Sequence, residues 1–344
     1  MPRIHLPICL LSLALILLTP RPAIAASSFD RQQLQAFITA MADQDQFSRD
    51  ELIRLFRQAR LQQRILEAIA RPAEGKPWYQ YRPIFLTGKR IRLGVEFRRK
   101  HAATLARAER EYGVPAAIIT AIIGVETFYG RHAGHYRVID ALATLGFNYP
   151  KRGAFFRQEL RHFLLLTREQ GFQAQDLVGS YAGAMGMPQF MPSSFRSYAV
   201  DFDGNGVKDI WTDPADAIGS VANYLSRHGW RTGHGIAVRV SSPPAGVRSF
   251  LDAGLKPAIP LQQLRDAGMR STAPVSGNPL VTLVSLEQEQ GPEYWLGLQN
   301  FYVITRYNHS PLYAMAVYQL AQAITDAYRS RDERAVSVGE GSAG

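Results

Sequence analysis

One apolar segment, Ala116–Val125 (AAIITAIIGV), constrains the fold of this chain more than any other feature. Its side chains offer water almost nothing to solvate, so the segment must be buried in the core. Pro115 stands directly before it, and proline favours the first turn of a helix. The pattern therefore predicts a buried helix that begins near Pro115, and Glu126 follows the apolar run at once.

Glu126 is expected to lie on an apolar helix face, one turn from Ile122, Ile123, Tyr129 and Gly130. A carboxylate in such surroundings is costly to keep ionised, so its pKa rises and it tends to hold its proton. A carboxyl that is still protonated near neutral pH is what a general acid requires. The alternative is a buried glutamate that is merely hydrogen-bonded.

The first 25 residues have the pattern of a secretory signal peptide. A basic start precedes an apolar run, and Ala23-Ile24-Ala25 is a cleavage pattern, so we expect cleavage after Ala25. An uncleaved membrane anchor is the alternative, although the run is short for a spanning helix. The only cysteine, Cys9, lies too far before the cleavage pattern for lipid attachment. We therefore expect a soluble periplasmic protein without disulfides.

The charge balance is basic. The formal net charge is +10 for the full sequence, and loss of Arg3 and Arg21 with the leader would leave +8. Such a protein favours anionic partners, including wall polymers and lipid surfaces, unless the charge serves solubility alone. The sequence contains no nucleic-acid-binding motif, and we expect a monomer that acts beside other cell-wall enzymes.

The expected organisation is α+β and mainly α. Ser48-x-x-Glu51 is a capping box in a helical N-terminal region, and β-rich runs appear after residue 234. The expected parts are a signal peptide at 1–25, a helical domain at 26–103, a catalytic core at 104–234, a small antiparallel β domain at 235–303, a helix at 304–328 that rejoins the core, and a disordered tail at 329–344.

A loop rich in Gly, Met and Pro spans Ser180–Ser194 and carries polar side chains at Ser180 and Gln189. Small residues let a ligand approach the backbone, so this loop suits the floor of a groove. The alternative is a packed turn whose methionines fill the core.

A second polar segment follows the pattern of a calcium-binding loop. Oxygen-bearing residues at loop positions 1, 3 and 5, a glycine at 6, a carbonyl at 7 and an aspartate at 9 match the EF-hand. They are Asp201, Asp203, Asn205, Gly206, Val207 and Asp209. Thr212 stands where the closing glutamate belongs. A structural Ca²⁺ or Na⁺ is expected, with a metal-free turn as the alternative, and no catalytic cofactor is expected.

The segments GVETFYGR, NYPKRGAFF, SYAGAMGMPQFMPSSF, YAVDFDGNG, SVANYL and TRYNHSPLYAMAVYQL together resemble the membrane-bound lytic murein transglycosylase B family, glycoside hydrolase family 103. The resemblance spans roughly residues 30–328. It implies a lysozyme-like core with an N-terminal α domain and a small β domain. The implied reaction is non-hydrolytic cleavage of the β-1,4 bond between N-acetylmuramic acid and N-acetylglucosamine in peptidoglycan, which leaves a 1,6-anhydromuramic end.

The resemblance also implies roles for particular residues. Glu126 matches the catalytic glutamate, and Asp216 matches a residue that closes a longer metal loop; Asp216 also fits a helix-capping acid. Lys151 stands where the family pattern has arginine. The residues that the resemblance places on the substrate are Ser180, Gln189, Lys151, Arg152, Tyr81 (with Tyr79 less firmly), Tyr224, Tyr307, Asn308 and Tyr313.

No second acid accompanies Glu126 in its motif, although most glycosidases pair two carboxylates. Asp140 and Asp176 stand in ordinary contexts that favour structural roles. One carboxyl suffices if the N-acetyl oxygen of the substrate attacks C1 and its C6 hydroxyl completes the reaction, since intramolecular attack has a large effective molarity. The rival interpretations are a hydrolytic muramidase and a non-catalytic wall-binding scaffold.

Overall fold

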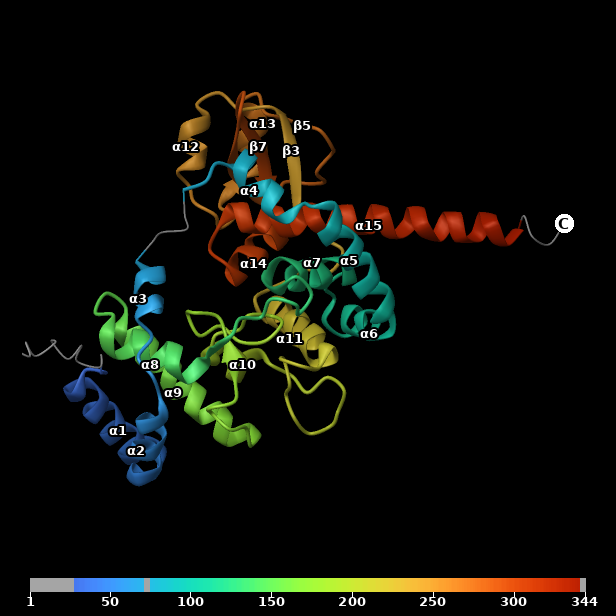
Figure 1. Cartoon of the computed structure of the whole chain (residues 1–344). Coiled ribbons are helices and arrows are strands. Elements are labelled where there is room, and N and C mark those ends of the chain that lie inside the picture. Colours follow the sequence, from blue (N-terminus) through green and yellow to red (C-terminus); the bar gives the residue numbers. More distant parts are fainter. Residues whose placement is uncertain (1–27, 71–74, 341–344) are drawn as a thin grey trace, which may run out of the picture.

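The computed structural model describes residues 28–70 and 75–340, which form a mainly helical body with a small sheet at one end (Figure 1). The described helices are α1 (Arg31–Asp45), α2 (Arg49–Gln58), α3 (Gln63–Ile69), α4 (Trp78–Phe85), α5 (Gly88–Lys100), α6 (Ala102–Tyr112), α7 (Ala116–Thr127), α8 (Val138–Asn148), α9 (Gly153–Gln170), α10 (Pro192–Tyr198), α11 (Pro214–Arg227), α12 (Val247–Leu251), α13 (Leu261–Asp266), α14 (Gln299–Tyr307) and α15 (Pro311–Glu340). The predicted signal peptide lies outside the described residues. Within the described part of the chain, no helix is long and apolar enough to span a bilayer.

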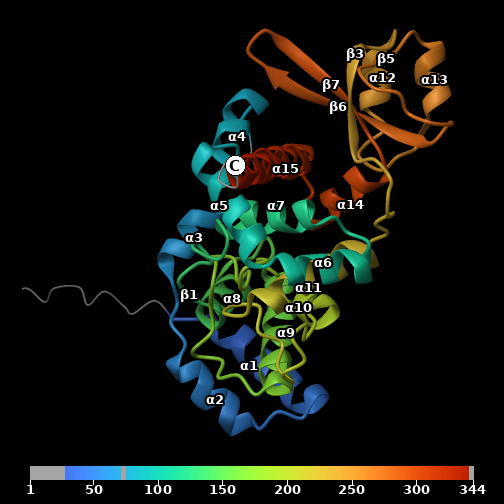
Figure 2. The ribbon, with the colours of Figure 1, turned by 90° about the vertical axis from the view of Figure 1, so that its right-hand side faces the viewer.

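Helix α7 is the buried helix that the apolar segment predicts. From Ala116 to Thr127, only Ala117 and Glu126 are not buried. It packs against α5, α6, α11 and α15, which surround it in the middle of the molecule (Figure 2). Pro115 is its N-cap, as the sequence suggests. A polar side chain at residue 126 is therefore presented by an almost fully buried helix.

The basic segment 90–111 is divided between two helices, α5 and α6. His101 leaves the helical conformation with φ −112° and ψ 26°, so α5 ends and α6 begins. The break lets α5 pack against α15 while α6 packs against α11. Gly113, in the left-handed conformation, ends α6 at the predicted place.

The N-terminal helices separate into two groups rather than forming one domain at 26–103. Helix α3 packs on α8, and the ring of Phe147 in α8 contacts those of Phe37 and Phe56 from α1 and α2. Helices α4 and α5 instead lie against α15 at the other side of the molecule (Figure 1). The packing therefore changes between α3 and α4, and not at residue 103.

The larger sheet is antiparallel, with strand order β4-β6-β7-β3-β5. Its strands are β3 (Ala237–Ser242), β4 (Ile259–Pro260), β5 (Arg270–Ser271), β6 (Leu280–Gln288) and β7 (Gly291–Gly297), and a second, two-stranded sheet pairs β1 (Tyr136–Arg137) with β2 (Val178–Gly179). The sheet has a small hydrophobic core of its own under α12 and α13, which includes Val240, Leu283 and Leu296. The sheet thus forms a satellite unit beside the main core.

The C-terminal part departs from the sequence prediction in two places. Residues 299–303 were expected at the end of the β domain, but they form the first part of α14, which buries Phe301 and Val303 in the main core. Helix α15 continues to Glu340, through most of the tail predicted to be disordered. Its segment AYRSRDERA is rich in helix-forming residues, which favours this continuation.

Candidate active site

Glu126 is the second-last residue of α7, directly before the helix ends. Phe128 and Tyr129 both adopt left-handed backbone angles, with φ 54° and 63°. The expectation that Tyr129 and Gly130 continue the helix face of Glu126 is therefore wrong, because the chain turns away after Thr127. A left-handed residue other than glycine costs about 1–2 kcal/mol, so surrounding contacts must hold this turn.

Glu126 is half-buried as a residue, but its carboxyl lies away from water. Burial raises its pKa from 4.5 to about 7, and a hydrogen bond from Tyr313 acts in the opposite direction. The Tyr313 hydroxyl donates to Oε1 at 2.6 Å. At neutral pH the carboxyl is therefore divided between its protonated and ionised forms, as a group that must give and take a proton requires.

Tyr313 belongs to a packed cluster of tyrosines behind Glu126. Its ring lies parallel to that of Tyr307 at 6.4 Å, and Tyr307 meets Tyr224 edge-on at 4.8 Å. Tyr224 and Tyr313 are buried, and the hydroxyls of Tyr224 and Tyr307 donate to the carbonyls of Arg306 and Pro188, both at 2.6 Å. Because both rings are buried, a contact of Tyr224 or Tyr313 with substrate stays a prediction.

The loop after β2 holds Ser180 and Gln189, which both remain partly exposed. Ser180 Oγ accepts the amides of Ala182 and Ala184 at 3.3 and 3.0 Å, so its own proton can be given to another acceptor. Gln189 has φ 53°, and its Nε2 donates to the carbonyls of Ala133 and Gly186 at 3.1 and 2.9 Å. The side-chain oxygen of Gln189 is then the group that can accept from a ligand.

Thr127 connects this loop to α7 by hydrogen bonds. Its hydroxyl donates to the Met187 carbonyl at 2.9 Å and accepts from the Gly130 amide at 3.0 Å. Met185 and Met187 are buried, as expected for a turn whose methionines fill the core, while the polar groups stay accessible. Sequence reasoning missed Thr127; the available signal was a hydroxyl residue directly after a glutamate that ends an apolar run.

The remaining predicted substrate residues lie around this centre. Tyr81 stacks with Trp78 and lies close enough to Tyr313 to raise the pKa of that phenol. Asn308 is exposed directly after α14. Lys151 and Arg152 are exposed before α9, where the Arg152 guanidinium lies 4.3 Å from the Phe155 ring centre. No described contact joins these three polar residues to Glu126.

Asp140 has the structural role that the sequence suggests. It is buried and accepts two hydrogen bonds from the Arg137 guanidinium, at 2.9 and 2.8 Å, and one from the Arg60 amide at 2.9 Å. Asp176 is exposed in a turn. Of these three acids, Glu126 is the one whose surroundings suit proton transfer.

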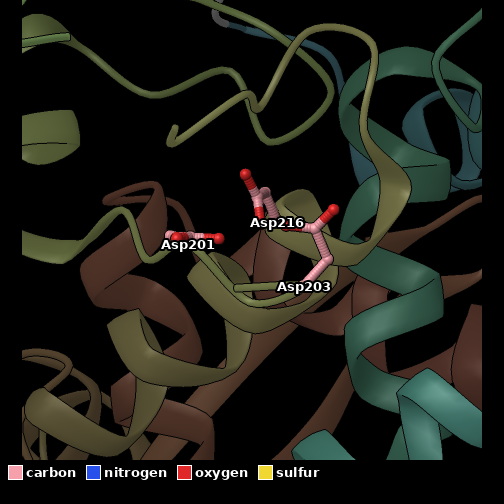
Figure 3. Close-up of side chains that lie close together, drawn as sticks. All are labelled: Asp201, Asp203 and Asp216. Carbon is pink, nitrogen blue, oxygen red and sulfur yellow. The ribbon is translucent and has the colours of Figure 1, made fainter. Parts of the chain in front are cut away.

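The acidic loop gathers three of its predicted ligands. Carboxylate oxygens of Asp201, Asp203 and Asp216 lie within 4.8 Å of one another, and Figure 3 shows the three side chains grouped around one space. Asp216 is fully buried, and burial raises its pKa. Its oxygens accept the amides of Phe202 and Asp209 at 2.6 and 2.7 Å. Oxygen-only carboxylate donors in this number fit a hard cation such as Ca²⁺.

Asp209 does not belong to that group of three carboxylates. Asp209 Oδ1 accepts the amides of Trp211 and Thr212 at 2.8 and 2.9 Å, so its carboxylate stabilises the following turn. The Asn205 side-chain oxygen accepts the Val207 amide at 2.9 Å. The expectation of Asp216 as the acid that closes the loop agrees with its place beside Asp201 and Asp203.

A mainly helical body that presents one partly protonated glutamate beside a polar loop defines a lysozyme-like, glycan-cleaving class of enzyme. The family described as "Transglycosylase SLT domain" matches residues 29–322. The chain therefore belongs to this family, and it is a lytic transglycosylase that acts on peptidoglycan, with the lysozyme-like fold of those enzymes.

Individual relatives agree with this assignment. Membrane-bound lytic murein transglycosylase B of Escherichia coli (strain K12) is 44% identical over 300 residues, which are 84% of this chain and 82% of that protein. The crystal structure of soluble lytic transglycosylase SltB1 from Pseudomonas aeruginosa is 54% identical, has a TM-score of 0.82, and covers 86% of this chain and 99% of its own. The structure of Escherichia coli Slt35 in complex with calcium is 44% identical, with a TM-score of 0.80 over 86% of this chain and 93% of its own.

Proposed function

We propose that Glu126 is the single acid and base of a non-hydrolytic cleavage of the β-1,4 bond between N-acetylmuramic acid and N-acetylglucosamine. The observation that carries the proposal is the position of this carboxyl at the end of α7, where burial raises its pKa to about 7. The engagement of Asp140 with Arg137 supports a mechanism without a second carboxylate.

In the first step, protonated Glu126 donates its proton to the glycosidic oxygen as the bond from C1 to that oxygen breaks. The N-acetyl oxygen of the muramic acid attacks C1 and forms an oxazolinium ion. In the second step, the Glu126 carboxylate takes the proton of the C6 hydroxyl while the C6 oxygen attacks C1. The bond between C1 and the acetamido oxygen breaks, which opens the oxazolinium ring. The products are a free N-acetylglucosamine hydroxyl and a 1,6-anhydromuramic end, and Glu126 is protonated again.

Tyr313 supports the second step, because its hydroxyl donates to the carboxylate that remains after the first proton transfer. Burial, followed by the nearby Glu126, raises the pKa of Tyr313 well above its usual value, so the phenol keeps its proton throughout. The ring of Tyr307 packs against that of Tyr313, and the ring of Tyr224 packs against that of Tyr307.

The substrate lies against Ser180 and Gln189 in this proposal. The Gln189 side-chain oxygen can accept from the acetamido N–H, which becomes more positive as the oxazolinium ion forms, and the Ser180 hydroxyl can orient the sugar. A well-placed polar group that faces developing charge contributes about 3 kcal/mol. Lys151, Arg152, Tyr81 and Asn308 are assigned to more distant parts of the glycan or its peptides.

The test is product analysis of digested peptidoglycan by mass spectrometry, with wild type and Glu126→Gln. Wild type should release anhydro-muropeptides, and Glu126→Gln should be folded and inactive. Release of reducing ends by the wild type would favour a muramidase that uses water. Binding to insoluble peptidoglycan without release of any product would favour a non-catalytic scaffold.

We further propose that Asp201, Asp203 and Asp216 hold a structural Ca²⁺. The proposal is supported by their grouping and by the calcium complex of Slt35. The ion would offset most of the negative charge of three neighbouring carboxylates and stabilise the loop before α11. Na⁺ is the competing ion, and calorimetry with each ion distinguishes the two.

We also propose a periplasmic enzyme that is exported with cleavage after Ala25 and is soluble. N-terminal sequencing of the mature protein that starts at Ala26, without lipid, is the expected result. A monomer in gel filtration is expected as well, and co-purification would identify other cell-wall enzymes that associate with it.

A further inference from the structure

We propose that Arg90 of α5 is a positioning residue that fixes the carboxyl of Glu126 by holding the turn at the end of α7. This inference rests on the proposed role of Glu126 as acid and base, and it assigns no contact between Arg90 and the substrate.

The turn that follows Glu126 needs such support. Phe128, Tyr129 and Gly130 have φ values of 54°, 63° and 82°, so three successive residues adopt left-handed angles and two of them are not glycine. Residues in this conformation persist only where the surroundings determine them. A small change in this turn would move Glu126, because the carboxyl lies two residues before Phe128.

Arg90 contacts the backbone and side chain on both sides of Glu126. Its Nε donates to the Gly124 carbonyl at 3.1 Å, and its guanidinium carbon lies 4.8 Å from the ring centre of Phe128. Its Nη1 also donates to the Ile84 carbonyl at the end of α4. One half-buried side chain thus joins α4, α5 and the last turn of α7.

Tyr129 makes a second contact between this turn and Arg90. This buried tyrosine donates its hydroxyl to the Arg90 carbonyl at 2.9 Å. The Tyr129 hydroxyl has room because residues 124 and 94 are glycines. A Cβ on Gly124 would lie 2.6 Å from the hydroxyl oxygen, and a Cβ on Gly94 would lie 2.5 Å from it. The side chain of Arg90 therefore holds the turn, and the turn in return holds the backbone of Arg90.

The role is one of position rather than of charge. The Arg90 guanidinium is directed at two backbone carbonyls and at the Phe128 ring, and it makes no described contact with the Glu126 carboxyl. The groups that affect the ionisation of Glu126 are its apolar surroundings and Tyr313. Loss of Arg90 should therefore lower the rate of the reaction without moving its dependence on pH.

The experiment compares Arg90→Met, Arg90→Lys and Tyr129→Phe with wild type on a soluble glycan substrate, at a temperature where circular dichroism shows each variant folded. Arg92→Met is the matched control, because Arg92 is an exposed arginine of the same helix. We expect Arg90→Met to lower kcat about 10- to 100-fold with KM changed by no more than about twofold. The midpoint of the pH profile should stay at its wild-type value.

Arg90→Lys should remain closer to Arg90→Met than to wild type, since lysine keeps the charge but lacks the planar fork that reaches two carbonyls. Tyr129→Phe, which removes one hydroxyl, should lower kcat by several-fold and keeps the inference testable if Arg90→Met does not fold. Wild-type kcat in Arg90→Lys and Tyr129→Phe, with only a lower melting temperature, would overturn it. A shifted pH midpoint in Arg90→Met with an unchanged maximal kcat would overturn it as well.

Glu126→Gln is measured beside these variants. If Glu126→Gln is inactive while Arg90→Met and Tyr129→Phe keep wild-type kcat, the positioning role fails and the proposed function stands. If Glu126→Gln keeps its activity, the proposed function itself fails.

Discussion

The hydroxyl of Tyr313 lies 2.6 Å from Oε1 of Glu126 and so joins α15 to α7 across 187 positions of the sequence. The two groups have opposed effects on the proton of the carboxyl. Burial favours the neutral acid, whereas the phenol stabilises the anion. Because neither effect removes the other, the carboxyl is suited to both halves of a reaction in which it loses a proton and then regains one.

Replacement of Tyr313 by phenylalanine should raise the pKa of Glu126, since it removes the hydrogen bond that favours the anion. The alkaline limb of the pH–rate profile should move to higher pH. The maximal rate should fall about 10- to 100-fold, because a hydrogen bond to a charged group contributes about 1.5–3 kcal/mol. Tyr307→Phe is the control, as its hydroxyl donates to the Pro188 carbonyl instead. A midpoint that stays unchanged or moves down would contradict this assignment.

The wild-type rate should decrease as pH rises through about 7, because the first step needs the protonated form of Glu126. The expected slope of log(kcat/KM) is about −1 per pH unit above that value, for the loss of one proton. Initial rates measured from pH 5 to 9 on a soluble glycan test this. A rate that is constant up to pH 9 would show that the acid has a different pKa.

Glu126→Gln should unfold at a higher temperature than the wild type at pH 8 and at nearly the same temperature at pH 5. The sign follows from linkage: a carboxyl with a folded pKa above its unfolded pKa contributes stability at low pH that is lost as pH rises through the folded pKa. The window therefore runs from about 4.5 to about 7. Calorimetric melting of both proteins across this range is the measurement, and equal melting curves at pH 8 would argue against a buried charge.

Asp140→Asn should lower the free energy of unfolding by about 3 kcal/mol, because it leaves the Arg137 guanidinium without its buried partner. The folded fraction should still release anhydro-muropeptides at the wild-type rate. Asp176→Asn is the matched control, and as an exposed substitution it should change stability by less than about 0.5 kcal/mol. Loss of activity in fully folded Asp140→Asn would point to a second catalytic carboxyl.

Addition of millimolar Ca²⁺ should raise the melting temperature of the wild type, with a gain of about 1 kcal/mol if its concentration is several times Kd. Asp203→Asn should abolish the effect without loss of activity at permissive temperature. Asp209→Asn should retain it, because the Asp209 carboxylate accepts the amides of Trp211 and Thr212. An effect that survives Asp203→Asn would exclude the three grouped carboxylates as the site.

Local signals predicted much of this fold. Pro115 before an apolar run predicted α7, and the side chain of Asp213 caps α11 beside a proline at its first position, where the sequence predicts that a helix begins. By contrast, α8 was not predicted. Almost all of its side chains are buried, so its apolar residues show no helical period that distinguishes it from a strand or a core loop.

The candidate site was predicted as a set of residues but not as an arrangement. The motif around Glu126 indicated the acid itself, while the contacts that adjust it come from α15 and from the loop of Met187. Contacts between residues so far apart in the sequence depend on how the helices pack, and this packing produces no periodic pattern in the sequence. For the same reason the burial of Tyr313 could not be recognised, since the residue type alone does not distinguish a tyrosine in a groove from one in a core.

The placement of Tyr313 on the last helix has a consequence for biosynthesis. Translation makes Glu126 long before α15, and α15 covers α7 only when the final residues have joined the fold. A chain that ends before α15 lacks the Tyr313 hydroxyl that donates to Glu126 and the helix with the largest contact on α7. The surroundings that adjust the proton of Glu126 are therefore complete only when the last helix has joined the fold.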